Sequence, residues 1–143
     1  MTRENETRRR AKGRWTLGPF LRLPRDLMEH EAFCTLSPRA TKFLIDIAWN
    51  YNGHNNGDLS ATFHQMKERG WNSSDQMHKA KKELLDRGLI LIARQGGLNK
   101  SNLYALTWFL INECNGKLDI SSTVKPPNDW KRWSASGNGL KKQ

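Results

Sequence analysis

A change from a helical to an extended pattern falls within Glu83-Leu84-Leu85-Asp86-Arg87-Gly88-Leu89-Ile90. Glycine commonly ends a helix because it adopts positive φ without strain, and Gly88 stands at the point of change. The residues that follow, 89–93, form a short apolar run of the kind that is typical of a buried strand. The stretch therefore predicts a helix up to Arg87 and a strand over residues 89–93.

The helix before Gly88 is predicted over residues 74–87. It begins with Ser73 and Gln76, which have the spacing of a capping box, where each side chain bonds the other's backbone N–H. At about 100° per residue, one face collects apolar side chains and the other collects charged ones. The apolar face holds Met77, Ala80 and Leu84, and the charged face holds Asp75, Lys79, Lys82 and Asp86. We expect the first face to be buried and the second to be open to a ligand.

Two more helices and a second strand surround this one. Ser37-Pro38 is a helix start, because serine caps free N–H groups and proline at the first position loses no hydrogen bond. It predicts a helix over 38–52, whose apolar face is Ala40, Phe43, Leu44, Ile47 and Ala48. Ser60 can cap another helix over 61–69 that stops at Gly70. A strand over 103–108 then completes a hairpin with the strand over 89–93.

The order helix, helix, helix, strand, loop, strand resembles the winged helix-turn-helix family over residues 37–108. The pattern Leu-x-x-x-Gly-Leu-Ile at the end of the third helix carries the resemblance, and the adjoining sequence is similar to small helix-turn-helix proteins of proteobacterial phages and plasmids. The resemblance implies a mainly α fold with a small β-hairpin (α+β). It also implies that the third helix enters the major groove of DNA.

Candidate DNA contacts follow from the resemblance. On the third helix, the candidates are Ser74, Gln76 and His78 for base edges, and Lys79 and Lys82 for phosphates. Asp75 and Asp86 on the same face argue against a uniformly basic surface. The hairpin loop, or wing, adds Arg94, Asn99 and Lys100 for the phosphates or the minor groove, unless it is a simple polar hairpin. A flexible arm adds Arg8, Arg9 and Arg10, with Lys12 and Arg14 beside them.

Charge and composition divide the chain into a basic disordered arm (1–19), a domain (20–110) and a basic, tryptophan-containing tail (111–143). The net charge is +10, and residues 1–25 alone carry 8 basic and 2 acidic side chains. In the tail, Trp130-Lys131-Arg132-Trp133 interleaves aromatic and basic residues, and packing on the domain is favoured over stacking on bases. Trp49, Trp71 and Trp108 are interpreted as core or core-edge residues.

Other classes of protein lack support in the sequence. The four histidines and the two cysteines, Cys34 and Cys114, have no metal-ligand spacing, so no metal or cofactor is expected. No nucleotide-binding loop, nucleophile motif or carboxylate pair indicates an enzyme. No segment has the roughly 18 apolar residues needed to cross a membrane, so a cytoplasmic location is expected.

The leading hypothesis is therefore a protein that binds double-stranded DNA and belongs to a mobile element, as a transcriptional regulator or a replication-associated factor. One alternative is a protein-interaction module that docks a host or replication protein. A further alternative is binding to single-stranded nucleic acid or RNA through the aromatic and basic tail. A homodimer is possible, but no heptad repeat in the sequence indicates one.

Overall fold

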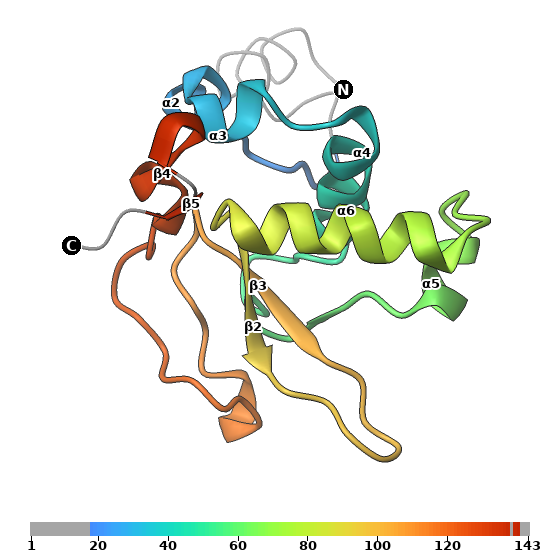
Figure 1. Cartoon of the computed structure of the whole chain (residues 1–143). Helices are drawn as coiled ribbons and strands as arrows, with labels where there is room; N and C mark the ends of the chain where they lie inside the picture. The colour runs from blue at the N-terminus through green and yellow to red at the C-terminus, as the bar shows by residue number, and fades with distance from the viewer. Residues whose placement is uncertain (1–17, 138, 141–143) are drawn as a thin grey trace, which may run out of the picture.

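The computed structural model describes residues 18–137 and 139–140, and combines helices with a small antiparallel sheet (Figure 1). The elements of the framework are α2 (Arg25–Glu29), α3 (Glu31–Cys34), α4 (Pro38–Ala48), β1 (Leu59–Ser60), α5 (Phe63–Lys67), α6 (Ser74–Asp86), β2 (Ile90–Arg94) and β3 (Leu103–Leu106). The shorter elements after β3 are η1 (Cys114–Gly116), η2 (Asp129–Arg132), β4 (Trp133–Ser134), η3 (Ala135–Gly137) and β5 (Gly139–Leu140). The predicted α+β class is confirmed.

Helix α4 begins as its sequence predicts. The Ser37 hydroxyl accepts a hydrogen bond from the N–H of Ala40 at 3.2 Å, and Pro38 occupies the first turn. The helix ends at Ala48 rather than at residue 52, so its predicted end was wrong. Beyond it, the Asn55 side chain accepts from the N–H of residue 52 at 2.8 Å and donates to the carbonyl of residue 50 at 2.9 Å. Asparagine side chains that bind the backbone in this way compete with the helix.

The capping box lies on α5 and not on α6. The Thr62 hydroxyl accepts from the N–H of Gln65 at 3.3 Å, and the Gln65 side chain accepts from the N–H of Thr62 at 3.2 Å. Ser60, the predicted cap, instead belongs to strand β1, and α5 is shorter than the predicted helix over 61–69. At α6, the Ser73 hydroxyl does accept from the N–H of Gln76 at 3.2 Å, but the Gln76 side chain bonds elsewhere.

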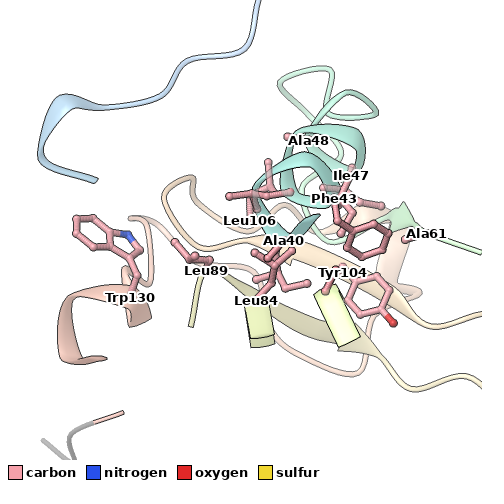
Figure 2. Close-up of a cluster of buried hydrophobic side chains, with 14 of the residues drawn as sticks. Ala40, Phe43, Ile47, Ala48, Ala61, Leu84, Leu89, Tyr104, Leu106 and Trp130 are labelled. Carbon is pink, nitrogen blue, oxygen red and sulfur yellow. The ribbon is translucent and has the colours of Figure 1, made fainter. Parts of the chain in front are cut away.

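Helix α6 is confirmed, and so are its two faces. Met77, Ala80 and Leu84 are buried, and the four charged residues predicted for the other face are exposed. The buried face packs on α4, and Figure 2 shows Phe43 and Ile47 of α4 gathered with Leu84 and with the strand residues that complete the core. Full burial of a leucine, isoleucine or phenylalanine side chain stabilises the fold by about 1.5–3 kcal/mol.

The sheet has the strand order β1-β3-β2, and both of its pairings are antiparallel. Tyr104 in the central strand faces Leu59 of β1 on one side and Ile92 of β2 on the other. Strand β2 runs from Ile90 to Arg94, one residue later than predicted, and β3 stops at Leu106 rather than at residue 108. After Leu106, the buried Thr107 turns its hydroxyl back to donate to the carbonyl of residue 88 at 2.6 Å.

Asn56 joins the loop after α4 to the chain after β3, and sequence reasoning missed it. Its side chain is fully buried. The amide nitrogen donates to the carbonyls of Leu106 at 2.9 Å and Leu110 at 2.8 Å, and the amide oxygen accepts from the N–H of Leu106 at 2.7 Å. These bonds satisfy backbone groups at the point where the sheet ends, so Asn56 stabilises the exit of β3.

The segment after β3 returns to the core through its tryptophans. Trp130 is only 2% exposed and lies edge-on to the His30 ring, with the ring centroids 5.2 Å apart. Packing, the favoured interpretation of this tail, is thus confirmed for Trp130, and Figure 1 draws η2 and β4 beside α2 and α3. Trp71 and Trp108 are buried as predicted. Trp49 is 66% exposed, so its assignment to the core or its edge was wrong, and it lies over the side chain of Arg69.

Arg87, at the C-terminal end of α6, connects a segment before α4 with a segment after β3. Its guanidinium donates to the carbonyl of Ala32 at 3.1 Å and to the hydroxyl and carbonyl of Thr35 at 2.6 and 3.1 Å. The same guanidinium lies over the Trp133 ring, 4.4 Å from the ring centroid. It therefore holds the end of α3 and the strand β4 against α6, by hydrogen bonds on one side and a cation–π contact on the other.

Candidate nucleic-acid interface

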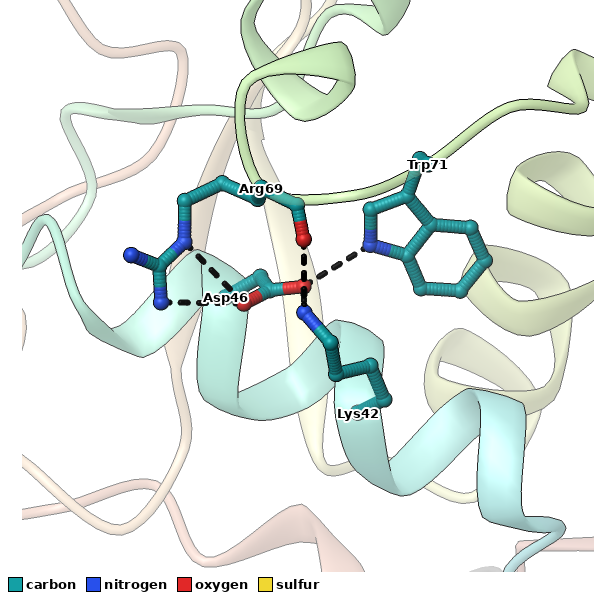
Figure 3. A network of polar contacts seen from close by, with 4 residues as sticks. All are labelled: Lys42, Asp46, Arg69 and Trp71. Carbon is teal, nitrogen blue, oxygen red and sulfur yellow. Dashed lines mark hydrogen bonds and ion pairs between the residues drawn. The ribbon is translucent and has the colours of Figure 1, made fainter.

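A buried carboxylate fixes the turn that joins α5 to α6. Asp46 of α4 is 1% exposed. Its Oδ2 accepts from Lys42 Nζ at 2.5 Å and Trp71 Nε1 at 2.8 Å, and its Oδ1 accepts from Arg69 Nε at 3.1 Å (Figure 3). Arg69 and Trp71 both belong to the turn between the two helices. Asp46 therefore sets the position of α6 relative to α4, and with it the direction of the exposed face of α6.

The side of α6 that lies next to the start of α4 is occupied by contacts within the protein. Glu83 Oε2 accepts from the N–H of Ser37 at 2.7 Å. About two turns toward the N-terminus, Gln76 Oε1 accepts from the Arg39 guanidinium at 2.6 Å. Gln76, a predicted base contact, is thus exposed, but its amide oxygen already has a partner.

The outward side of α6 carries two ion pairs between residues four apart. Lys79 Nζ lies 3.1 Å from Asp75 Oδ2, and Lys82 Nζ lies 3.6 Å from Asp86 Oδ2. All four side chains are more than half exposed, so each pair contributes only about 0.5 kcal/mol to stability. Both lysines that were predicted to meet phosphates therefore have a carboxylate beside them.

The side of α6 that faces the β2–β3 hairpin is different. His78 is exposed there, and Lys81 places its ammonium over the Tyr104 ring, 5.3 Å from the ring centroid. Lys81 makes no ion pair with any of the residues that the structure describes. Between α6, the start of α5 and the hairpin is a hollow of about 220 Å³. It is lined by Ala61, Thr62, Phe63, Met77, His78, Lys81, Ser101, Asn102 and Tyr104.

The hairpin loop is held in shape by its own hydrogen bonds. Asn102 Oδ1 accepts from the N–H of Gly96 at 2.5 Å, and the Arg94 guanidinium donates to the carbonyl of Ser101 at 3.0 Å. Arg94 is half-buried, so this predicted contact also has a structural role. At the tip, Asn99 has a φ of 59°, and both Asn99 and Lys100 are exposed.

Most of the residues that the sequence singled out lie on α6 or on the hairpin, and among those described only His78 lines the hollow between the two elements. Exposed positions on α6 are Ser74, Gln76, His78, Lys79 and Lys82, and the hairpin carries Arg94, Asn99 and Lys100. Arg8, Arg9 and Arg10 lie outside the described residues. Sequence reasoning missed Lys81, because the helical pattern shows which face is polar and not where the hairpin lies. No local signal in the sequence distinguished Lys81 from its neighbour Lys82.

A second hollow, of about 500 Å³, lies between the loop after α4 and the chain after β3. Tyr51 stacks there on Phe109, with the ring centroids 4.5 Å apart, and both line the hollow with Arg22 and His54. Burial raises the pKa of Tyr51, and the nearby charge of Arg22 lowers it by less. Tyr51 therefore stays uncharged at neutral pH.

Neither a metal site nor a membrane span is found in the described part of the chain. Within residues 18–137 and 139–140, no three histidine, cysteine, aspartate or glutamate side chains gather as metal ligands would. The helices of the same region are too short and too polar to cross a bilayer. No protein-family model, curated protein or solved structure matches this chain.

Proposed function

We propose that this protein is a winged helix-turn-helix protein that binds double-stranded DNA. Helix α6 enters the major groove in this proposal, the β2–β3 hairpin lies on the backbone, and the arginines before residue 18 add contacts. The single observation that carries the proposal is the placement of α6. Its polar face is open to solvent along the whole helix, and the hairpin stands beside that face.

The arrangement of elements supports the same proposal. The chain runs α4, β1, α5, α6, β2, β3, and its sheet has the order β1-β3-β2. In winged helix-turn-helix proteins, the corresponding third helix inserts into DNA and the hairpin forms the wing. Asp46 and its partners hold α6 firmly on α4, so that the helix can present its side chains in a fixed direction.

Size and charge agree with a duplex as the ligand. Helix α6 has 13 residues and is therefore roughly 20 Å long, and the major groove, about 12 Å wide, admits a helix. Residues 73–102, which contain α6 and the hairpin, carry 6 basic and 3 acidic side chains. A polyanion is the natural partner of such a surface, because counterions are released when phosphates are neutralised.

The biological setting belongs to the same proposal and rests on the resemblance to phage and plasmid proteins. In that setting, the protein acts in the cytoplasm for a mobile element, either as a transcriptional regulator or in replication. Both roles need occupation of a duplex site, so the first question is whether the protein binds duplex DNA at all.

An equilibrium titration with fluorescent duplex and single-stranded oligonucleotides tests the proposal. The duplex should bind more tightly, and log affinity should fall steeply with log salt. A variant that replaces the lysines of α6, K79Q/K81Q/K82Q, should lose at least about eightfold in affinity at 0.1 M salt. A control with the same change of net charge, K117Q/K125Q/K131Q, alters lysines outside α6 and the hairpin and should lose less.

Three results would contradict the proposal. Equal losses in the two triple variants would mean that charge alone attracts the DNA, with no role for α6. No binding to a duplex, together with recovery of a stable protein partner, would favour the interaction module instead, and preferential binding of the single strand would favour the third hypothesis.

A further inference from the structure

The exposed surface of α6 consists of two stripes that differ in net charge. The outward stripe contains the pairs Asp75–Lys79 and Lys82–Asp86, in which each positive charge has a negative one within 3.1 or 3.6 Å. The hairpin-facing stripe contains Lys81 and His78 and no carboxylate. A DNA phosphate therefore meets a net positive charge only on the hairpin side of the helix.

The hollow beside the hairpin-facing stripe has the chemistry of a sugar–phosphate site. Lys81 supplies a cation at its wall, and the hairpin supplies the hydroxyl of Ser101 and the amide nitrogen of Asn102, which also donates to the Tyr104 hydroxyl at 3.3 Å. Its floor is apolar, because Phe63 and Met77 line it. Cations and polar donors suit phosphate oxygens, and an apolar floor suits the carbon faces of a deoxyribose.

On the outward stripe, by contrast, a phosphate would compete with carboxylates that are already in place. A phosphate that approaches Lys79 also approaches Asp75, and the repulsion between the two anions offsets the attraction. The same holds at Lys82 and Asp86. A lysine paired with a carboxylate brings almost no net charge to a phosphate, so it releases few of the cations condensed on DNA and adds little to the salt-dependent part of binding.

We propose that the backbone of one DNA strand lies in the hollow between α6 and the β2–β3 hairpin and is held there by Lys81, whereas the outward stripe holds no phosphate. This inference rests on the proposed function and specifies how the duplex is oriented on the protein. The outward stripe then faces base edges, where a carboxylate can accept from cytosine and a lysine can donate to guanine. Lys79 and Lys82 are thereby reassigned from phosphate contacts to the side of the helix that discriminates sequence.

Charge-balanced variants separate the two stripes. The variants D75N/K79Q and D86N/K82Q each remove an ion pair without changing the net charge of the protein. K81Q removes the single lysine of the hollow, and K125Q, in the loop before η2, lowers the net charge equally and serves as its control. K81R keeps the charge in the hollow. A short duplex of mixed sequence is the probe, because it reports contacts to the backbone and not to one operator.

One phosphate contact contributes a slope of about 0.9 to the plot of log affinity against log salt, or roughly eightfold between 1 M and 0.1 M salt. K81Q should therefore lose about eightfold in affinity at 0.1 M salt, with a slope smaller by about 0.9. Both paired variants, K125Q and K81R should stay within about twofold of the wild type and keep its slope. Thermal unfolding of each variant confirms that the fold is intact.

The inference is overturned if K81Q behaves like K125Q, or if a paired variant loses as much affinity and slope as K81Q does. Either result would leave the proposed function standing, because the wild-type protein would still bind the duplex. If the wild-type protein binds no duplex, the proposed function fails first, and the inference falls with it.

Discussion

Replacing Asp46 with leucine should lower the free energy of unfolding by about 3 kcal/mol, mostly through the indole N–H of Trp71. Leucine has the same heavy-atom branching as aspartate, so the substitution removes the acceptors without opening a cavity. Trp71 is 8% exposed and its Nε1 donates only to Asp46, at 2.8 Å, among the described residues. A buried donor that loses its acceptor costs about 1–3 kcal/mol.

The ion pairs of Asp46 add less than the indole. The side chains of Lys42 and Arg69 are 53% and 35% exposed, so both cations can turn to water when the carboxylate is gone. Solvent therefore screens both ion pairs, and together they contribute about 1 kcal/mol to the free energy of unfolding. A domain of this size has a total stability of about 5–15 kcal/mol, so the variant should still fold.

Urea unfolding followed by far-ultraviolet circular dichroism measures the effect as a lower midpoint with an unchanged slope. The same substitution in a W71F background is the matched test, because phenylalanine has no N–H to leave without a partner. There, Asp46→Leu should cost only about 1 kcal/mol. A loss below about 1 kcal/mol in the wild type, or an equal loss in both backgrounds, would refute the reasoning.

Three further substitutions test other parts of the fold. Asn56→Ala should destabilise by about 3 kcal/mol or more, because it leaves the N–H and carbonyl of Leu106 buried without partners, and an unchanged thermal midpoint would contradict this. Thr62→Ala should cost about 1 kcal/mol as a lost helix cap and Ser60→Ala less, and a reversed order in urea unfolding would restore Ser60 as the cap. Trp130→Ala should cost about 3–5 kcal/mol, and a cost near zero would show that the segment after β3 does not belong to the core.

The parts of the fold that were predictable from sequence depend on contacts between near neighbours. The periodic burial of Met77, Ala80 and Leu84 follows from helix geometry alone, and the start of α4 follows from Ser37 and Pro38. Both signals lie within a few residues of the structure that they determine. Helices α4 and α6 could therefore be placed before any long-range contact was known.

The errors have long-range causes. Ser60 has the right chemistry for a cap, but its backbone pairs with Leu103 in the sheet, which places the cap two residues later at Thr62. The partners of Asn56 lie 50 or more residues away along the chain, and Trp71 lies 25 residues from Asp46. No local pattern reports such distances.

The candidate site was predictable to the same extent. A helical pattern identified the polar face of α6, and every predicted residue on that face is exposed. The pattern could not distinguish Lys81 from Lys82, because the difference between them depends on the hairpin and on the position of Asp86. The arm residues lie outside the described structure, so their role stays a prediction.

The contacts of Arg87 limit how short a working fragment of this protein can be. A fragment trimmed to residues 37–108 would contain every element from α4 to β3, and therefore the whole of the proposed DNA-binding unit. It would nonetheless remove Ala32, Thr35 and Trp133, and leave the Arg87 guanidinium at the end of α6 without the hydrogen bonds and the cation–π contact that these residues provide. The helix that is proposed to hold DNA is thus clamped at its far end by pieces of chain from outside the shortest recognisable unit.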